Sequence, residues 1–272
     1  MITQIRGVKY YIDSFHINDA LPNLIMLHGF MGSSGSFFHL IDALNEVANV
    51  ILIDLLGHGE TEAPIHTDRY SAEEQTADLK EIINEYGPNI ILHGYSMGGR
   101  LALQFACTYP GLVNSLILES TTAGIVSQEE RIRRRKKDAI LSKRLMENKE
   151  LFIEEWNQLP LFENITTLPA DIDAQITAIQ QVQNPVGLNN SLLGFGTGKM
   201  PPLQDSLPDV DIPCLILAGA NDAKFIDEGK YLSNKITGCR YIEIEKASHR
   251  IHLDNPDAYL MPILDFIKKL QR

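Results

Sequence analysis

The stretch "LHGYSMGGRLAL", residues 92–103, places Ser96 between glycines, directly after an apolar run and at the opening of a helical pattern. Within it, "GYSMG" (94–98) matches G-x-S-x-G, a motif whose glycines allow a sharp strand-to-helix turn that lifts the serine oxygen above a sheet. The start of the helix also points free N–H groups toward that oxygen. This context favours a reactive serine over a chance match in a glycine-containing loop.

The rest of the chain repeats short apolar runs that end in Gly, Asn or Asp. Continuously apolar runs are typical of parallel strands buried on both faces, whereas 240–249 alternates as an edge strand does. The apolar runs are "NLIMLHGF" (23–30), "NVILIDLLGHG" (49–59), "NIILHGYSMGG" (89–99), "NSLILEST" (114–121) and "PCLILAGAND" (213–222). Helical patterns lie at 71–86, about 97–109, 227–236 and 256–270, the first opened by a capping box of Ser71 and Glu74. This alternation predicts an α/β fold with a mostly parallel central sheet and helices on both faces.

Residues 122–207 break this rhythm. They are helical and polar, and they contain the basic run "RIRRRKK" (131–137) and the single tryptophan, Trp156. An insertion of this length predicts a helical cap over the carboxyl ends of the strands, where such sheets bind ligands. We expect residues 1–121 and 208–272 to form the core domain.

Composition narrows the class of protein. With 44% hydrophobic and 22% charged residues, the chain reads as an ordinary soluble globular protein. The net charge of -11 disfavours nucleic acid and anionic membranes as partners, so an anionic ligand needs a local basic patch. Three scattered cysteines and a charged stretch over residues 1–20 predict a cytoplasmic protein without a disulfide framework, signal peptide or membrane insertion. The oligomeric state is not visible in the sequence.

A serine hydroxyl needs a histidine base that is itself oriented by a carboxylate. In a fold of this kind the chain order is serine, acid, histidine. Asp222, at the end of an apolar run, and His249, before the last helical pattern, satisfy that order after Ser96. The alternatives left open are Glu119 and then Asp54 for the acid, and His252, His58 and His28 for the base.

A developing oxyanion needs two fixed hydrogen-bond donors. The backbone N–H of Met97 follows the serine directly, and the N–H of Phe30 lies in the loop "LHGFMGSS" after the first apolar run. We expect these two amides to form the oxyanion hole.

Arg100 lies one helical turn beyond Ser96 on the same helix face, although a surface arginine is the alternative interpretation. In the basic run, Arg131, Arg134 and Arg135 share one helix face and the other cations point elsewhere. Two or three inward guanidinium groups beside Arg100 predict a polyanionic ligand on an otherwise acidic protein, and a wholly solvated helix is the alternative interpretation.

The segments "LHGF", "DLLGHGET", "GYSMGG", "GAND" and "ASH" follow one another in the order and spacing of the α/β-hydrolase superfamily, which the chain resembles over essentially its whole length. One branch is especially similar. "GYSMGGR", "EERIRRR", "WNQLPLF" (156–162) and "QNPVGLNNSLLGFGTGK" (183–199) resemble the 2-succinyl-6-hydroxy-2,4-cyclohexadiene-1-carboxylate synthases, lyases of menaquinone biosynthesis.

That resemblance implies a small tricarboxylate substrate from which a ring proton is removed and pyruvate expelled. It implies that Ser96, activated by His249 and Asp222, acts as a general base. By position, the carboxylates would contact Arg100 and Arg134, and the pocket walls would include Tyr95 and Trp156, with Arg131 as a further candidate. Where some members carry another arginine, this chain aligns Gln180 or Leu193, so amide donors or Lys199 would replace it.

Two other functions remain open at this stage. A hydrolase of an anionic ester or of a carbon–carbon bond would use the same three residues with Ser96 as a nucleophile, and a non-catalytic binding protein would keep only the cavity. We expect no metal and no cofactor, because no cluster has metal-ligand spacing and "GFGTGK" (194–199) lacks the spacing of a phosphate loop.

Overall fold

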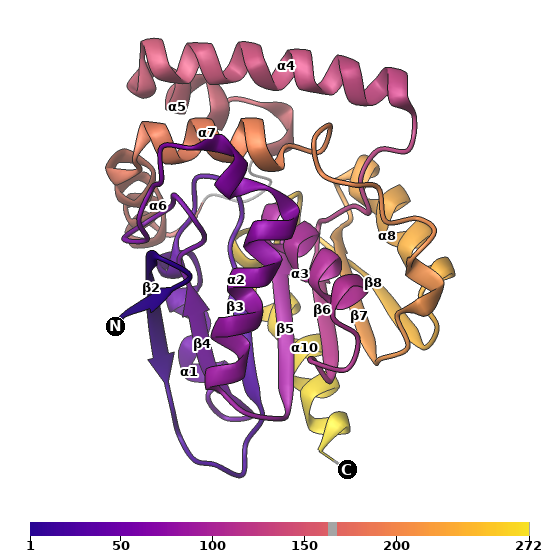
Figure 1. Cartoon of the computed structure of the whole chain (residues 1–272). Helices are drawn as coiled ribbons and strands as arrows, with labels where there is room; N and C mark the ends of the chain where they lie inside the picture. The colour runs from indigo at the N-terminus through magenta and orange to yellow at the C-terminus, as the bar shows by residue number, and fades with distance from the viewer. Residues whose placement is uncertain (163–167, 272) are drawn as a thin grey trace.

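A computed structural model describes residues 1–162 and 168–271. Eight strands form one sheet in the order β1-β2-β4-β3-β5-β6-β7-β8 (Figure 1). Their bounds are β1 Ile2–Ile5, β2 Val8–Phe15, β3 Asn23–Leu27, β4 Asn49–Ile53, β5 Ile90–Tyr95, β6 Ser115–Glu119, β7 Cys214–Gly219 and β8 Cys239–Ile244. From β4 to β8 all neighbours are parallel, which confirms the predicted sheet, and β8 lies at the edge as its alternation indicated.

The opposite edge contains two strands that the sequence analysis did not predict. β1 and β2 pair antiparallel as a hairpin, and β2 pairs antiparallel with β4. Their side chains alternate between buried and exposed, so they lack the continuously apolar signal of the central strands.

Helices cover both faces of the sheet, as predicted. Apolar side chains of α2 (Ala72–Glu85), α3 (Met97–Thr108) and α8 (Ala223–Lys235) pack on one face, and those of α1 (Ile41–Leu44) and α10 (Pro256–Leu270) pack on the other. Helix α8 begins four residues earlier than predicted, because the Asp222 side chain caps it by accepting the N–H of Phe225 at 3.4 Å.

The segment between β6 and β7 forms a layer of helices above the carboxyl ends of the strands (Figure 1). It contains α4 (Gln128–Glu147), α5 (Lys149–Asn157), α6 (Ala170–Val182) and α7 (Pro185–Phe195). Helix α4 is the outermost and packs on α7 (Figure 1). Below, α6 contacts the 3-10 turn Ser34–Leu40 and α7 contacts the 3-10 turn Thr67–Tyr70, so this layer, hereafter the cap, is joined to the core at two places.

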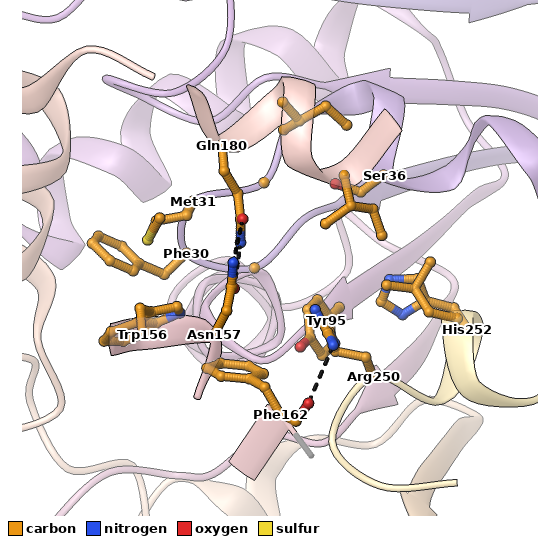
Figure 2. Close-up of a pocket in the computed structure, with 15 residues that line it drawn as sticks. Phe30, Met31, Ser36, Tyr95, Trp156, Asn157, Phe162, Gln180, Arg250 and His252 are labelled. Atoms are coloured by element: carbon orange, nitrogen blue, oxygen red, sulfur yellow. Dashed lines mark hydrogen bonds between the residues drawn. The ribbon is translucent and has the colours of Figure 1, made fainter. Parts of the chain in front are cut away.

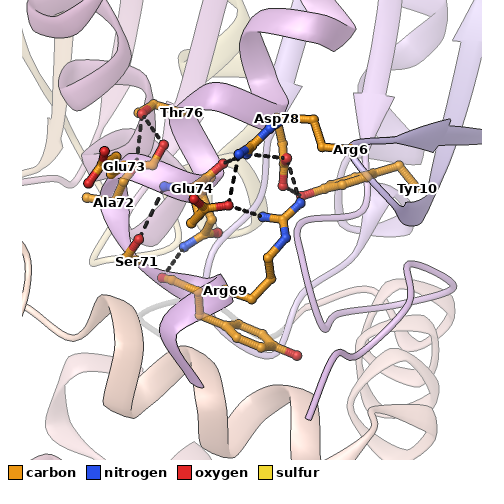
Figure 3. A network of polar contacts seen from close by, with 11 residues as sticks. Arg6, Tyr10, Arg69, Ser71, Ala72, Glu73, Glu74, Thr76 and Asp78 are labelled. Atoms are coloured by element: carbon orange, nitrogen blue, oxygen red, sulfur yellow. Dashed lines mark hydrogen bonds and ion pairs between the residues drawn. The ribbon is translucent and has the colours of Figure 1, made fainter. Parts of the chain in front are cut away.

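An ion network around buried Asp78 joins the hairpin to α2 (Figure 3). Asp78 accepts hydrogen bonds from the Tyr10 hydroxyl at 2.7 Å and from Arg6 and Arg69 at 3.0 and 2.6 Å. The predicted capping box is half formed: Ser71 accepts the N–H of Glu74 at 3.2 Å, while the Glu74 carboxylate pairs with Arg6 and Arg69.

Among the residues that the structure describes, no helix combines the length and apolarity needed to cross a bilayer.

Candidate active site

Ser96 lies on a strained turn between β5 and α3. Its φ of 51° and ψ of -101° are rare for a residue with a side chain, and the N-cap position aims it above the sheet. The turn depends on close backbone approach, because a Cβ on Gly94 would collide with the backbone of Gly98, and one on Gly98 with the carbonyl oxygen of Leu27. The turn therefore requires glycine on both sides of the serine, because any side chain there would collide with the backbone.

Three side chains meet in a hydrogen-bonded line at this turn. The Oγ of Ser96 lies 3.0 Å from Nε2 of His249, and Nδ1 of His249 lies 2.9 Å from Oδ2 of Asp222. Because the carboxylate can only accept, Nδ1 carries the proton and Nε2 is left to accept the serine proton. Burial lowers the pKa of His249 from its ordinary value of 6.5, while the Asp222 hydrogen bond and charge oppose that shift. The histidine is therefore a neutral base at neutral pH.

The alternative acids and bases form hydrogen bonds outside the line of Ser96, His249 and Asp222. Glu119 pairs with His252 at 2.7 Å. Asp54 accepts the N–H groups of Ser34 and Glu60 and so holds two loops.

His28 and His58 lie side by side under the loop that contains Phe30. The Nε2 of His28 accepts the N–H of Leu55 at 3.0 Å, so its Nδ1–H donates to the Gly29 carbonyl at 2.7 Å. Burial lowers the pKa of His28 to about 4, and burial together with His28 lowers that of His58 to about 3, which keeps both rings neutral.

The two expected oxyanion donors lie beside the serine. The loop that contains Phe30 is fixed by His28 and by the hydrogen bond from the Gly98 N–H to the His28 carbonyl, at 3.1 Å. Within the described part of the chain, no acceptor is found for the backbone N–H of Phe30 or of Met97. Both amides are available to a ligand, which is the property that an oxyanion hole requires.

A cavity, here the serine cavity, opens over Ser96 and His249 beneath the cap. Three cations line it: Arg100 from α3, Arg134 from α4 and Lys224 from α8. Its other lining residues are Phe30, Tyr95, Met97, Thr121, Thr122, Trp156, Leu161, Phe162, Ser191, Leu192, Gly196, Thr197 and Phe225. The cavity thus offers positive charge on an apolar and aromatic background.

Arg100 and Lys224 differ from Arg134 in that neither forms an ion pair among the described residues. The guanidinium of Arg100 donates to the carbonyl of Phe195 and stacks over that ring, 4.8 Å from the centroid. Burial, and then the nearby Arg134, lowers the pKa of Arg100 to about 9 against the opposing charge of Asp138, so Arg100 remains a cation at neutral pH. An anion in the cavity would relieve this unfavourable state.

The basic cap helix contributes one residue to the cavity and not three. Arg134 lines it, with its Nε bound to Asp138 at 2.8 Å. Arg131 and Arg135 lie on the same face, as predicted, but they donate to the carbonyls of Lys199 and Gly198 and hold that loop in place. The placement does not support Arg131 as a ligand for substrate, and Lys199 lines a separate groove beside Arg69.

A second cavity adjoins the first across Phe30, Trp156 and Phe162 (Figure 2). Here Gln180 and Asn157 exchange two amide hydrogen bonds of 2.8 and 2.9 Å, and Arg250 donates to the Phe162 carbonyl at 3.2 Å. Of the two positions aligned with the missing arginine, Gln180 faces this cavity, whereas Leu193 faces the groove of Lys199.

Three aromatic contacts, to Phe30, Phe152 and Phe162, explain the position of Trp156. It packs on Phe30 and Phe152, with ring centroids 5.2 and 5.6 Å away, and it lines both cavities. It is therefore part of the cap core and a wall of the site.

Lys224 is the charged residue in the lining of the serine cavity that sequence reasoning missed. It follows Asp222 by two positions, so the helix that the aspartate caps carries the lysine toward the serine. Burial, and then Arg134, lowers the pKa of its ammonium group. The spacing of two residues between Asp222 and Lys224 is the sequence feature that could have predicted this position.

The sheet order, the serine turn and the cap define the class of protein. A family model described as alpha/beta hydrolase fold matches residues 22–143, in agreement with this architecture. The fold is therefore an α/β-hydrolase fold, with a helical cap inserted between β6 and β7.

Relatives place the chain within one branch of this class. A protein from Bacillus subtilis (strain 168), named "putative 2-succinyl-6-hydroxy-2,4-cyclohexadiene-1-carboxylate synthase", is 36% identical and covers 99% of this chain and 98% of its own length. A Serratia proteamaculans (strain 568) protein named 2-succinyl-6-hydroxy-2,4-cyclohexadiene-1-carboxylate synthase is 27% identical, covering 90% of this chain and 93% of its own. The solved structure of MenH from S. aureus superimposes with a TM-score of 0.90 at 34% identity, over 97% of this chain and 99% of that one. The chain belongs to the family of these synthases.

Proposed function

We propose that this chain is a 2-succinyl-6-hydroxy-2,4-cyclohexadiene-1-carboxylate synthase, a carbon–oxygen lyase of menaquinone biosynthesis. Its substrate would be 2-succinyl-5-enolpyruvyl-6-hydroxy-3-cyclohexene-1-carboxylate, from which it eliminates pyruvate. The names of the relatives support this reaction. The observation that carries the proposal is the serine cavity, where Arg100, Arg134 and Lys224 surround the hydrogen-bonded Ser96 and His249.

The cations match the proposed substrate in number and sign. Three carboxylates bring three negative charges into a cavity lined by three cations. Guanidinium groups hold carboxylates in two parallel hydrogen bonds, which fixes orientation as well as position. A neutral ester would leave the charge of Arg100 offset only by nearby Asp138, so the cavity favours an anionic substrate.

In the mechanism that we propose, Ser96 is a general base. His249 takes the serine proton, and the serine oxygen takes the ring proton next to the succinyl carbonyl. The C–H electron pair moves onto that carbonyl oxygen, where the amides of Phe30 and Met97 would stabilise the enolate. The electrons return to form a new ring double bond, the existing ring double bond shifts by one position, and the carbon–oxygen bond to the enolpyruvyl group breaks. The leaving enolate takes up the proton held by His249 and becomes pyruvate.

The test follows both possible products. The purified protein would be mixed with the enolpyruvyl substrate, generated in situ by the enzyme that precedes it, while pyruvate release and cleavage of a p-nitrophenyl ester are measured. Fast pyruvate release with negligible ester cleavage is expected. Ester cleavage without enzyme-dependent pyruvate release would instead make Ser96 a nucleophile and the chain a hydrolase, and the absence of both with ligand still bound would indicate a binding protein.

Ser96→Ala is the matched variant for this test. Removing the hydroxyl should lower kcat by about 10³-fold or more while substrate still binds, because triad residues act as a unit. A Ser96→Ala protein with unchanged pyruvate release would contradict the proposed role of the serine.

A further inference from the structure

A second buried acid–histidine pair lies next to the catalytic one, and the proposed mechanism does not use it. Glu119, the last residue of β6, is 0% exposed, and His252, on the short helix α9 (Ile251–Asp254), is 1% exposed. Nδ1 of His252 donates to Oε1 of Glu119 at 2.7 Å, and the backbone N–H of His252 donates to the same oxygen at 3.2 Å. One carboxylate oxygen therefore holds both the ring and the backbone of the segment that follows His249.

The backbone of Glu119 holds the other half of the catalytic pair. Its carbonyl accepts the N–H of Ser96 at 2.9 Å. A single residue thus binds the serine turn through its main chain and the histidine loop through its side chain. Displacement of Glu119 would change the separation between Ser96 and His249.

Tyr95 extends this connection toward the oxyanion loop (Figure 2). Its ring contacts the ring of His252 edge-on at 4.7 Å and that of His249 at 5.4 Å. On the opposite side the ring packs on Gly29, where an added Cβ would come within 2.5 Å of it. Gly29 precedes Phe30, so the packing of Tyr95 reaches one of the two expected oxyanion donors.

We propose that Glu119 and His252 are positioning residues that hold His249 and, through Tyr95, the Phe30 loop in their places around Ser96. The inference rests on the proposed catalytic role of Ser96 and His249, and not on the identity of their substrate. A small displacement of a catalytic group lowers the rate steeply, which gives such a pair a direct effect on turnover.

The charge of Glu119 supports this arrangement. Burial alone would raise the pKa of the Glu119 carboxyl, but His252 and then His93 outweigh it and hold the pKa at about 2, so the group is an anion at neutral pH. Three charged groups act on His249: Asp222 and Glu119 raise its pKa, and Lys224 lowers it. Glu119 therefore adds a second fixed negative charge behind the catalytic base.

Three variants test the pair. Glu119→Gln removes the charge at nearly constant volume. His252→Leu removes the ring donor, and His252→Asn restores an N–H close to the position of Nδ1. The control is Asp78→Asn, because Asp78 is equally buried and hydrogen-bonded but lies in the ion network of Figure 3, outside the residues that line the serine cavity.

The readouts are kcat and KM for pyruvate release, thermal unfolding, and the NMR titration of the His249 ring, assigned with His249→Asn. Glu119→Gln and His252→Leu should lower kcat by about tenfold or more with KM within about twofold, and His252→Asn should recover most of the rate. In Glu119→Gln the His249 titration should move to lower pH. Asp78→Asn should lower the unfolding temperature and change neither kcat nor the titration.

An unchanged kcat or an unchanged His249 midpoint in folded Glu119→Gln protein overturns the inference. If that variant does not fold, equal rates of His252→Leu and the unaltered protein overturn it. If the unaltered protein releases no pyruvate, the proposed function fails separately, and the His249 titration in Glu119→Gln still decides whether the pair acts on the base.

Discussion

Arg100 lines the serine cavity and forms no ion pair among the described residues, and the charge of nearby Asp138 offsets its desolvation only in part. A carboxylate of the substrate would offset more of it at each turnover. Arg100→Gln should therefore lower kcat/KM roughly 10- to 150-fold, because the loss of a charge-assisted hydrogen bond raises the free energy of the bound transition state by about 1.5–3 kcal/mol. Steady-state kinetics of pyruvate release measure the effect.

The control for Arg100 is Arg133→Gln on the outer face of α4. Arg133 is 65% exposed and pairs with Glu129 and Glu130, so the substitution should leave kcat/KM unchanged. If Arg100→Gln behaved like Arg133→Gln, the argument for a carboxylate at Arg100 would be lost.

In the proposed mechanism, His249 sets the acidic limit of activity. The base must be neutral to accept the serine proton, and burial places its pKa below 6.5. As pH falls through that pKa the base is protonated, so kcat/KM should decline with a midpoint below pH 6.5. A pH profile of pyruvate release measures this midpoint, and a value above 6.5 would show that the hydrogen bond to Asp222 outweighs burial.

At the residue scale, the sequence predicted the turn that contains Ser96 and the chain order of the acid and the histidine, but not the full lining of the serine cavity. Ser96, Asp222 and His249 follow from chain order, because each comes after a strand that ends at the same edge of the sheet. Arg131 lies on the predicted face but does not line the cavity, because helix periodicity gives a face and not the neighbour that the face meets, here the Gly198–Lys199 loop. Lys224 was missed because α8 starts earlier than its apolar pattern indicates.

At the scale of elements, the central strands were predictable because burial on both faces requires continuously apolar runs. The β1–β2 hairpin was not, since its alternating pattern over a few residues competes with that of a loop. The helices of the cap were expected as a group, but their packing depends on contacts such as Ser142 with Asn189, which no local pattern contains.

Two serines at helix N-termini, one in the core domain and one in the cap, allow the contributions of these two parts to be tested separately. Ser71 accepts the N–H of Glu74 at 3.2 Å at the start of α2, and Ser127 accepts that of Glu130 at 3.4 Å at the start of α4. Ser71→Ala should lower the free energy of unfolding by about 1 kcal/mol and leave KM unchanged. Ser127→Ala should raise KM, because α4 positions Arg134 in the serine cavity.

Urea denaturation and steady-state kinetics on both variants distinguish these effects. Each protein serves as the control for the other, since the change in chemistry is identical. Equal KM values for Ser71→Ala and Ser127→Ala would mean that the start of α4 does not influence the position of Arg134.

At the scale of the whole molecule, neutral buried histidines make stability depend on pH. His28 and His58 lie in the core with pKa values of about 4 and about 3, whereas in the unfolded chain each titrates near 6.5. Below pH 6.5 the unfolded state therefore binds more protons than the folded state, and the free energy of unfolding falls as pH falls. Between pH 7 and 5 each histidine should remove on the order of 2 kcal/mol.

His58→Phe isolates one of these contributions. A phenyl ring fits the space beside His28 and Phe30 and does not titrate, so the loss of unfolding free energy between pH 7 and 5 should be smaller by on the order of 2 kcal/mol. Any change in packing is the same at both pH values and cancels in the difference. The unaltered protein, measured in parallel, is the control. Urea titrations at pH 7 and 5 measure the difference, and an identical loss in His58→Phe and the unaltered protein would show that His58 is already protonated in the folded state.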